Sequence, residues 1–220
     1  MIEILTMPQG SPEWVQARLG LPTASEFADV MAKGKGLVRR GYLMRLAAER
    51  ITGEPQERYS NARMRQGKEL EAEARDLYAY LESVRCGGDL IEPQLVGLIK
   101  NGIAGYSPDG LIGDCGLLEI KTLIPPLMVG LLSQGGYPPE HKAQLQGGLW
   151  VSNRGWIDFV GYWPGMPLHV VRVGRDEDYI AELSNEVERF AAELDDVVRR
   201  VGISPKAALR DMMESSLEVL

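Results

Sequence analysis

The chain has 220 residues, 45% of them hydrophobic and 25% charged, and a formal net charge of -7. This composition is typical of one globular domain with a sizeable core, and no apolar run is long enough to cross a membrane. Two cysteines, two histidines and no signal-peptide pattern argue against a disulfide framework or a zinc site and indicate a cytoplasmic protein with no membrane partner.

Basic side chains are concentrated in residues 33–68, which hold 10 Lys and Arg against 3 Asp and Glu. Residues 1–68 hold 11 basic and 7 acidic residues, a net charge of +4, whereas residues 69–220 hold 13 and 24, a net charge of -11. A basic block on an acidic chain is typical of a local surface that faces nucleic acid. A solvated basic helix face would give the same counts, so both interpretations stay open.

The N-terminal segment is predicted to contain a short strand, residues 2–5, followed by a helix. Ser11 as N-cap and Pro12 at the first helical position mark the start of this helix. It would carry Trp14 and Arg18, four residues apart, on one face. Trp14 is interpreted as a core anchor, whereas Arg18 is a candidate for anion binding or for a surface salt bridge.

A second helix start follows at residues 23–26, where Thr-Ala-Ser-Glu has the form of a capping box, and this helix is expected to run to about residue 31. The free N–H groups of its first turn and the hydroxyl of Ser25 favour an anion at this end. The alternating lysines and glycines of residues 33–36 then predict a flexible basic loop.

Two longer helices are expected next. One spans about residues 39–52, and the other spans about residues 60–84 with Ser60 as its N-cap. Glu71 lies on the second helix three residues after Lys68, so these two side chains can pair across one turn. Glu71 can equally face the carboxylates described next, and the helical pattern leaves both possibilities open.

The stretch 105–121, G-Y-S-P-D-G-L-I-G-D-C-G-L-L-E-I-K, has the residue types of a metal-dependent active site. It is expected to form short strands joined by turns. Glu119 and Lys121 then lie on one face of a strand, and a hairpin can place Asp109 beside them. Converging carboxylates repel unless a cation lies between them, and their oxygens suit Mg²⁺ or Mn²⁺. A neighbouring lysine can stabilise the reacting phosphate or help to activate water.

This order of residues is the P-D-x(n)-E-x-K pattern of metal-dependent nucleases. The bare letters occur often by chance, and a hairpin with a solvated charged edge would also contain them. The Pro-Asp-Gly turn, the spacing and the apolar strand around the charged pair favour the nuclease interpretation.

The second half of the chain alternates helices and strands. We expect helices at about 127–132, 139–151, 176–201 and 205–217, and strands at 156–163 and 168–173. The order of elements predicts an α/β fold with a mixed sheet covered on both faces. Helices come first, then strands interrupted by one helical crossover, and then helices again.

Six blocks of sequence between about residues 9 and 173 carry a family resemblance. They are E-W-x(3)-R-L-G (13–20), T-A-S-E (23–26), G-K-x-x-E-x-x-A-R (67–75), S-P-D-G-L (107–111), L-E-I-K (118–121) and A-Q-L-Q-x-x-L-W-V (143–151). Through them the chain resembles the lambda-type phage exonucleases of homologous recombination, which are viral alkaline exonucleases of the PD-(D/E)xK, restriction-endonuclease-like superfamily. The resemblance implies a restriction-endonuclease-like core in a single domain.

The resemblance further implies a Mg²⁺-dependent 5′→3′ exonuclease that digests linear double-stranded DNA by two-metal hydrolysis. Its product would be a 3′ single-stranded overhang for annealing. Family members form ring-shaped homotrimers around DNA and work with a single-strand annealing protein. Three parts are expected: a mostly helical DNA-end-binding portion, the catalytic sheet and C-terminal helices, at residues 1–84, 85–173 and 174–220.

The resemblance also assigns the catalytic residues. Asp109 and Glu119 look like metal ligands, together with the backbone carbonyl of Ile120. Lys121 looks like the catalytic lysine that orients or deprotonates the attacking water. Glu71 matches a helix carboxylate near the second of two Mg²⁺ ions, for which Mn²⁺ can substitute.

Gln144 matches an active-site glutamine on the following helix. Arg18, Ser25 and Ser107 match a pocket for the 5′-phosphate, which agrees with the anion-binding helix start argued above. Two further family matches fall in the basic block. Met64 is at the position of an apolar wedge that splits the terminal base pair, or else it is an ordinary core methionine, and Lys35 matches a DNA contact. The candidate site residues are therefore completed by Gln144 and by the five DNA-binding candidates, namely Arg18, Ser25, Lys35, Met64 and Ser107.

Two alternatives stay open. A structure-specific endonuclease such as a junction resolvase would share the fold and cleave closed circular DNA. A non-catalytic DNA-end-binding recombination adaptor would bind ends without hydrolysis, although the presence of the acidic residues and Lys121 argues against it. A small-molecule phosphoesterase would leave the basic block unexplained.

Overall fold

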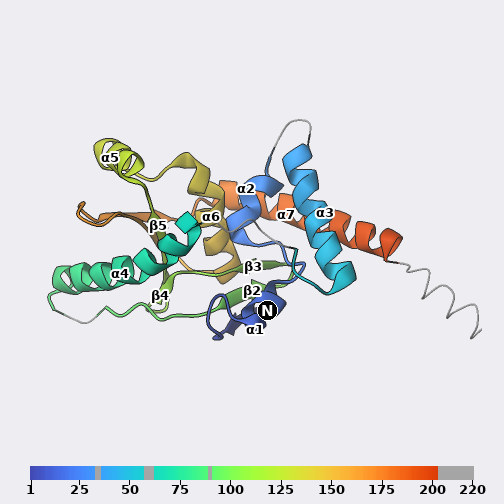
Figure 1. Cartoon of the computed structure of the whole chain (residues 1–220), viewed down its shortest axis with the longest axis horizontal. Helices are drawn as coiled ribbons and strands as arrows, with labels where there is room; N and C mark the ends of the chain where they lie inside the picture. Colours follow the sequence, from blue (N-terminus) through green and yellow to red (C-terminus); the bar gives the residue numbers. More distant parts are fainter. Residues whose placement is uncertain (33–35, 57–61, 89–90, 203–220) are drawn as a thin grey trace, which may run out of the picture.

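A computed structural model describes residues 1–32, 36–56, 62–88 and 91–202, with the backbone only for residues 62–68 (Figure 1). In this described part of the chain the strands form two hydrogen-bonded sheets. The first is antiparallel, in the order β1-β2-β3, and the second is mixed, in the order β4-β5-β6-β7, with β5 and β6 parallel. The strands are β1 (Ile2–Leu5), β2 (Leu98–Asn101), β3 (Ala104–Tyr106), β4 (Gly110–Ile112), β5 (Gly116–Thr122), β6 (Trp156–Tyr162) and β7 (His169–Gly174).

The division into two sheets follows from the Ser-Pro-Asp turn between β3 and β4. Pro108 has no N–H to donate to a strand ladder, so pairing stops there and resumes at Gly110. The two sheets remain linked because Gln94 and Leu111 exchange backbone hydrogen bonds of 2.8 and 2.9 Å. The chain therefore turns at the junction of the two sheets, and this turn carries Asp109.

Helices cover both faces of the mixed sheet, as the sequence predicts (Figure 1). Ala74 and Tyr78 of α4 pack against Leu118 and Val160 on one face. On the other face, α6 packs against the sheet, and α7 packs against α6. The helices are α1 (Pro12–Arg18), α2 (Phe27–Val30), α3 (Leu37–Thr52), α4 (Ala62–Arg85), α5 (Pro125–Gln134), α6 (Lys142–Ser152) and α7 (Glu177–Val201), with short 3₁₀ turns η1 (Ala24–Glu26) and η2 (Pro139–His141).

The prediction of a capping box at residues 23–26 is wrong. The segment forms η1 and the four-residue α2, and the Thr23 side chain makes no capping hydrogen bond. Tertiary contacts occupy its residues instead, because the Thr23 hydroxyl accepts a 3.3 Å bond from Arg18 and Glu26 pairs with Arg45 at 2.7 Å. By contrast, the predicted Ser11 cap is confirmed by a 3.2 Å bond from the Trp14 N–H.

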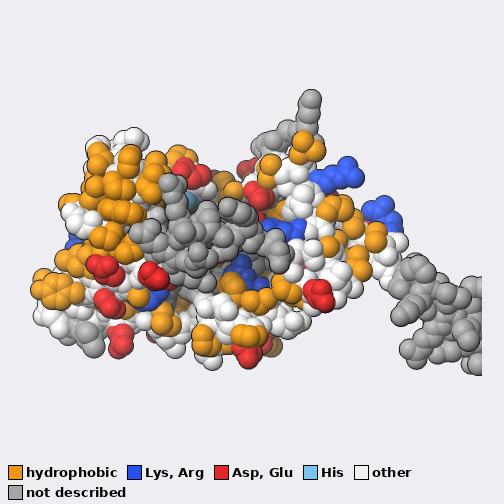
Figure 2. Space-filling view, viewed as in Figure 1, with side chains coloured by type: hydrophobic (Ala, Val, Ile, Leu, Met, Phe, Trp, Pro, Cys, Tyr) orange, Lys and Arg blue, Asp and Glu red, His pale blue; other side chains and the backbone are white. Residues whose placement is uncertain are grey.

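The predicted cap Ser60 and the predicted helix 205–217 lie outside the described residues. Among the helices that are described, none is both long enough and apolar enough to cross a membrane. The surface of α5 is nevertheless apolar, and Figure 2 shows hydrophobic side chains gathered over this helix. Leu127 is 59% exposed and Val129 is 53% exposed there.

Candidate active site

Strand β5 presents its charged residues on the face that α6 covers. Successive side chains of a strand point to opposite faces, so Leu118 and Ile120 pack under α4 while Glu119 and Lys121 point the other way. The Lys121 Nζ lies 2.7 Å from Glu119 Oε1. Glu119 is 3% exposed, whereas the Lys121 side chain is 26% exposed. The pair therefore combines a buried carboxylate with a lysine whose side chain is only partly exposed.

Three side chains donate hydrogen bonds to the buried Glu119 carboxylate. Lys121 and Gln144 both donate to Oε1, the latter over 2.5 Å, and the Tyr106 hydroxyl donates to Oε2 over 2.8 Å. A buried carboxylate is stabilised only when such donors replace its water shell. The structure thus brings the predicted Gln144 into the site. It adds Tyr106, which sequence reasoning missed because its position on β3 pointed to no chemistry.

The turn before β4 fixes Asp109 against the same strand. Its N–H donates to the Leu118 carbonyl over 3.0 Å, and its Oδ2 accepts the Ile120 N–H over 2.6 Å. Burial raises the pKa of Asp109 well above its ordinary value, and the negative charges of Glu119 and Glu71 raise it further. Negative charge is therefore in excess at this point of the molecule.

The positive charge of Lys121 offsets part of this excess negative charge. Burial lowers its pKa, but the carboxylates of Glu119, Asp109 and Glu71 outweigh burial and raise the pKa above the ordinary value. In this arrangement Lys121 is a cation. This ammonium group faces the carboxylates of Glu119 and Asp109, whereas Glu71 pairs with Arg75.

Glu71 on α4 is oriented by a residue that sequence reasoning missed. Arg75 donates to Glu71 Oε1 over 2.7 Å and, through Nε, to the Asp109 backbone carbonyl over 2.8 Å. The Arg75 side chain is 16% exposed. The one available signal was its place in the G-K-x-x-E-x-x-A-R block, four residues after Glu71 and on the same helix face. The guanidinium ties the helix to the catalytic turn.

The oxygen atoms of this site have the chemistry that a divalent cation requires. The carboxylates of Asp109 and Glu119 are hard oxygen ligands beside an excess of negative charge, which suits Mg²⁺ or Mn²⁺. Ile120 lies next to Asp109 through its N–H, and a ligand role for its carbonyl stays a prediction. Within the described residues, no three acidic, His or Cys side chains form a group that could hold a metal ion. Glu71, the third acidic residue predicted for the site, is bonded to Arg75 instead.

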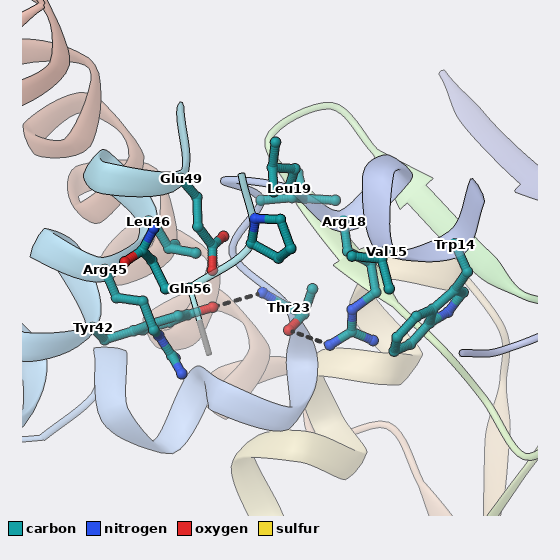
Figure 3. A pocket seen from close by; sticks show the side chains of 12 residues that line it. Trp14, Val15, Arg18, Leu19, Thr23, Tyr42, Arg45, Leu46, Glu49 and Gln56 are labelled. Carbon is teal, nitrogen blue, oxygen red and sulfur yellow. Dashed lines mark hydrogen bonds between the residues drawn. The ribbon is translucent and has the colours of Figure 1, made fainter. Parts of the chain in front are cut away.

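The candidate 5′-phosphate residues lie at the junction of α1, η1 and β3. Ser107 Oγ accepts bonds from Arg18 over 3.0 Å and from the Trp14 indole N–H over 3.1 Å. The Arg18 guanidinium also lies 4.2 Å from the centre of the Trp14 ring. Figure 3 shows Arg18 between Trp14 and Thr23, beside a cavity of about 190 Å³.

Ser25 is exposed and reaches this group only indirectly. Its Oγ lies 3.3 Å from the Thr23 hydroxyl, which bonds Arg18. The Thr23 N–H in turn donates to the Tyr42 hydroxyl over 3.0 Å (Figure 3). The structure therefore brings together Arg18 and Ser107 and places Ser25 one contact further out. The predicted core-anchor role of Trp14 is wrong: its side chain is half-buried outside the core, and its indole N–H donates to Ser107 Oγ.

The basic block is less open to solvent than its charge suggests. Lys35 and the Met64 side chain lie outside the described residues. Within the described part, Arg39 pairs with Glu193 at 2.6 Å and Arg50 with Asp195 at 2.5 Å, both on α7. Arg45 pairs with Glu26. These arginines attach α3 to its neighbours, which the charge counts alone could not reveal.

The mixed sheet, the acidic pair Asp109 and Glu119 and the adjacent Lys121 place the chain among proteins with a phage-exonuclease fold. The YqaJ-like viral recombinase domain matches residues 13–155, and the chain belongs to this family. Comparison with curated protein sequences gave no match.

Solved structures agree with this assignment. The alkaline exonuclease LHK-Exo from Laribacter hongkongensis is 36% identical, with a TM-score of 0.77 over 90% of this chain and 98% of that chain. Its complex with dAMP is 37% identical, with a TM-score of 0.78 over the same shares. A phage-related exonuclease from Haemophilus somnus 129PT is 15% identical and shares the fold, with a TM-score of 0.59 over 82% of this chain and 96% of that chain. The predicted resemblance and fold are confirmed, and family membership supports nuclease chemistry.

Proposed function

We propose that this protein is a Mg²⁺-dependent 5′→3′ exonuclease that digests linear double-stranded DNA and leaves 3′ single-stranded overhangs. The observation that carries the proposal is the buried Glu119 carboxylate, which Lys121 and Gln144 contact while Asp109 is fixed against the same strand. Family membership and the likeness to an alkaline exonuclease support the same activity.

The chemistry is phosphodiester hydrolysis. In the proposed site Mg²⁺, or Mn²⁺ in its place, would supply a Lewis acid for the scissile phosphate and the attacking water. Asp109 and Glu119 would hold this cation, and Tyr106 and Gln144 fix the orientation of Glu119. Lys121 contributes positive charge beside the reacting phosphate, where it stabilises the transition state.

The proposed mechanism includes a second metal ion. Glu71 is its expected ligand, and Arg75 holds that carboxylate close to the Asp109 turn. Arg75 bonds Glu71 Oε1, so Glu71 Oε2 is the oxygen that would contact a second cation without loss of the Arg75 bond. The dependence of the initial rate on Mg²⁺ concentration tests this point, because two ions give a second-order rise at low Mg²⁺.

The proposed 5′→3′ direction of digestion rests on the contact between Arg18 and Ser107. A guanidinium and a hydroxyl that already meet over 3.0 Å form a site for a phosphate monoester at the DNA terminus. The same proposal includes a ring-shaped homotrimer in the cytoplasm of the host cell, which works with a single-strand annealing partner. It also assigns DNA-end binding to residues 1–84 and treats the C-terminal helices as residues 174–220. Light scattering gives the subunit number directly.

The decisive experiment uses purified protein, Mg²⁺ and end-labelled duplexes with a 5′-phosphate or a 5′-hydroxyl, beside closed circular DNA. We expect digestion of the linear 5′-phosphorylated duplex from its 5′ ends and an intact circle. Cleavage of the circle would identify an endonuclease instead, and end binding without hydrolysis would identify an adaptor. Arg18→Ala is expected to remove the preference for 5′-phosphate, whereas an unchanged preference would show that the phosphate site is misplaced.

A further inference from the structure

Gly20 ends the E-W-x(3)-R-L-G block and has no side chain with which to bind DNA. It lies in a turn of residues 18–21, which is closed by a 3.0 Å bond from the Leu21 N–H to the Arg18 carbonyl. Leu19 has φ -57° and ψ 121°, and Gly20 has φ 64°, which is the pattern of a type II turn with its third residue in a left-handed conformation. Glycine suits this position and sets the direction in which the chain leaves Arg18.

Side chains of α3 bond both polar groups of the Gly20 backbone. The Gly20 N–H donates to Glu49 Oε2 over 2.9 Å, and the Gly20 carbonyl accepts a bond from Arg50 Nε over 2.7 Å. The fit is close, because a Cβ at Gly20 would lie 2.2 Å from Arg50 Cγ. Gly20 is buried, and a buried peptide group needs such partners. Glu49 and Arg50 therefore determine where the 18–21 turn lies against α3.

Helix α1, which carries Arg18, depends on polar contacts for its position. It has seven residues, and none of them is buried. Burial of apolar side chains in the core therefore does not hold this helix in place. Near its start, the Trp14 indole N–H donates to the Gly97 carbonyl over 2.9 Å. The bonds of Gly20 to α3 are the corresponding contact at its C-terminal end, two residues after Arg18.

The charge of Glu49 is unfavourable at this place. Glu49 and Arg18 line the same cavity, and Figure 3 shows the two side chains on opposite sides of it. A negative charge close to a phosphate site weakens anion binding by repulsion. A positioning role offsets that cost, because misplacement of a contact group by about 1 Å can reduce its effect on the order of a hundredfold.

We propose that Glu49 and Arg50 are positioning residues of the 5′-phosphate site, which hold the 18–21 turn so that the Arg18 guanidinium meets Ser107. The inference rests on the proposed 5′-phosphate site and identifies residues that determine its specificity through Arg18. Arg50 also pairs with Asp195 of α7 at 2.5 Å, so one side chain joins the C-terminal helix to this turn.

The test compares binding of two DNA hairpins, each with one duplex end, that differ only in a 5′-phosphate or a 5′-hydroxyl. Fluorescence anisotropy in EDTA measures binding without hydrolysis. Wild type should prefer the phosphorylated hairpin, and Glu49→Ala should lower this preference about tenfold. Repulsion alone predicts the opposite sign, because loss of a negative charge would strengthen the preference. Glu49→Gln keeps an oxygen that accepts the Gly20 N–H and should retain the preference.

A double-mutant cycle shows whether Glu49 acts through Arg18. Arg18→Ala should remove the preference for 5′-phosphate, and Glu49→Ala added to it should have no further effect. Arg50→Ala should lower the preference as Glu49→Ala does. Arg39→Ala is the matched control, because Arg39 also joins α3 to α7, through Glu193 rather than through the 18–21 turn. This control should keep the wild-type preference.

The inference is overturned if Glu49→Ala leaves the preference unchanged or strengthens it. Equal losses in Glu49→Gln or in Arg39→Ala, or a wild type that binds both hairpins equally, would overturn it as well. A loss in Glu49→Ala that is absent from Glu49→Gln and from the Arg18→Ala background supports it. The proposed function fails separately: a wild type with this preference that does not digest linear duplex in Mg²⁺ has the positioned phosphate site but is not an exonuclease.

Discussion

Two buried carboxylates lie on neighbouring strands of the mixed sheet, and their surroundings differ. Asp158 of β6 is 1% exposed and accepts two hydrogen bonds of 2.9 Å from Arg172 and one of 2.7 Å from Tyr78. Arg172 also lies over the Trp156 ring at 3.6 Å. Arg172 thus pairs with Asp158, and Glu82, itself paired with Arg85, adds a further negative charge near Tyr78 and Arg172.

Glu119 of β5 has the same number of donors but a different balance of charge. Its ammonium partner Lys121 also faces Asp109, whose pKa is raised by burial and then by neighbouring carboxylates. Satisfied hydrogen bonds are common to both sites, whereas Glu119 also interacts with the carboxylate of Asp109, on which the charge of Glu71 acts as well. The comparison teaches that clustering of carboxylates, more than burial, distinguishes the proposed catalytic carboxylate from the structural one.

The largest expected effect follows from removing the excess charge. Asp109→Asn should lower the rate of duplex digestion about a thousandfold, because cation binding supplies several kcal/mol to the transition state. Since the pKa of Asp109 is higher in the fold than in the unfolded chain, its ionised form destabilises the metal-free protein at neutral pH. Urea denaturation without metal should therefore show equal or greater stability for the variant. A less stable variant would mean that Asp109 is structural.

The second prediction concerns the structural carboxylate. Asp158→Ala should lower the free energy of unfolding by about 3 kcal/mol, because it leaves the Tyr78 hydroxyl buried without its partner and removes the partner of Arg172. Arg172 is 53% exposed and can return to water, which limits the loss. Urea denaturation measures the change. If Asp158→Ala abolished digestion without any loss of stability, the distinction between the two carboxylates would not hold.

A third and smaller effect sharpens the boundary of the functional site. Arg75→Ala should reduce digestion by about tenfold or more, through misplacement of Glu71 and the Asp109 turn. Added guanidinium ion should restore part of the activity, which a merely destabilised fold would not allow. Arg85→Ala is the matched control on the same helix, where Arg85 pairs with Glu82 at 2.7 Å. Equal losses in the two variants would contradict a positioning role for Arg75.

The smallest effect compares the two tyrosines that donate to these carboxylates. Tyr106→Phe and Tyr78→Phe should each lower the free energy of unfolding by about 1–2 kcal/mol. Only Tyr106→Phe should change the Mg²⁺ concentration for half-maximal activity, since its oxygen contacts Glu119.

The ionisation of the Tyr78 and Tyr106 hydroxyls gives a prediction of pH dependence. Burial raises the pKa of both tyrosines, and the adjacent carboxylates raise it further. A pKa raised in the folded state means that stability is complete below the ordinary tyrosine value and is lost as pH rises above it. Ultraviolet titration should therefore show both hydroxyls still protonated at pH values above the ordinary tyrosine pKa.

Local sequence signals predicted most of the elements. Ser11 caps α1 as expected, Gly53 ends α3 in a left-handed conformation, and strand alternation places Glu119 and Lys121 together. These features depend on neighbours within a few residues, so a single sequence contains them. The capping box at residues 23–26 had equally good local form and failed, because Arg18 and Arg45 from other elements engage its side chains.

The sequence by itself determined the elements of the fold, the acidic pair with its lysine, and the family to which the chain belongs. Tertiary structure alone decided which donors surround Glu119, how Arg75 joins α4 to the Asp109 turn, and that arginines of the basic block pair with α7. The physical reason is that each of these contacts joins residues from separate elements. Their distances depend on how the sheets and helices pack, which no local pattern encodes.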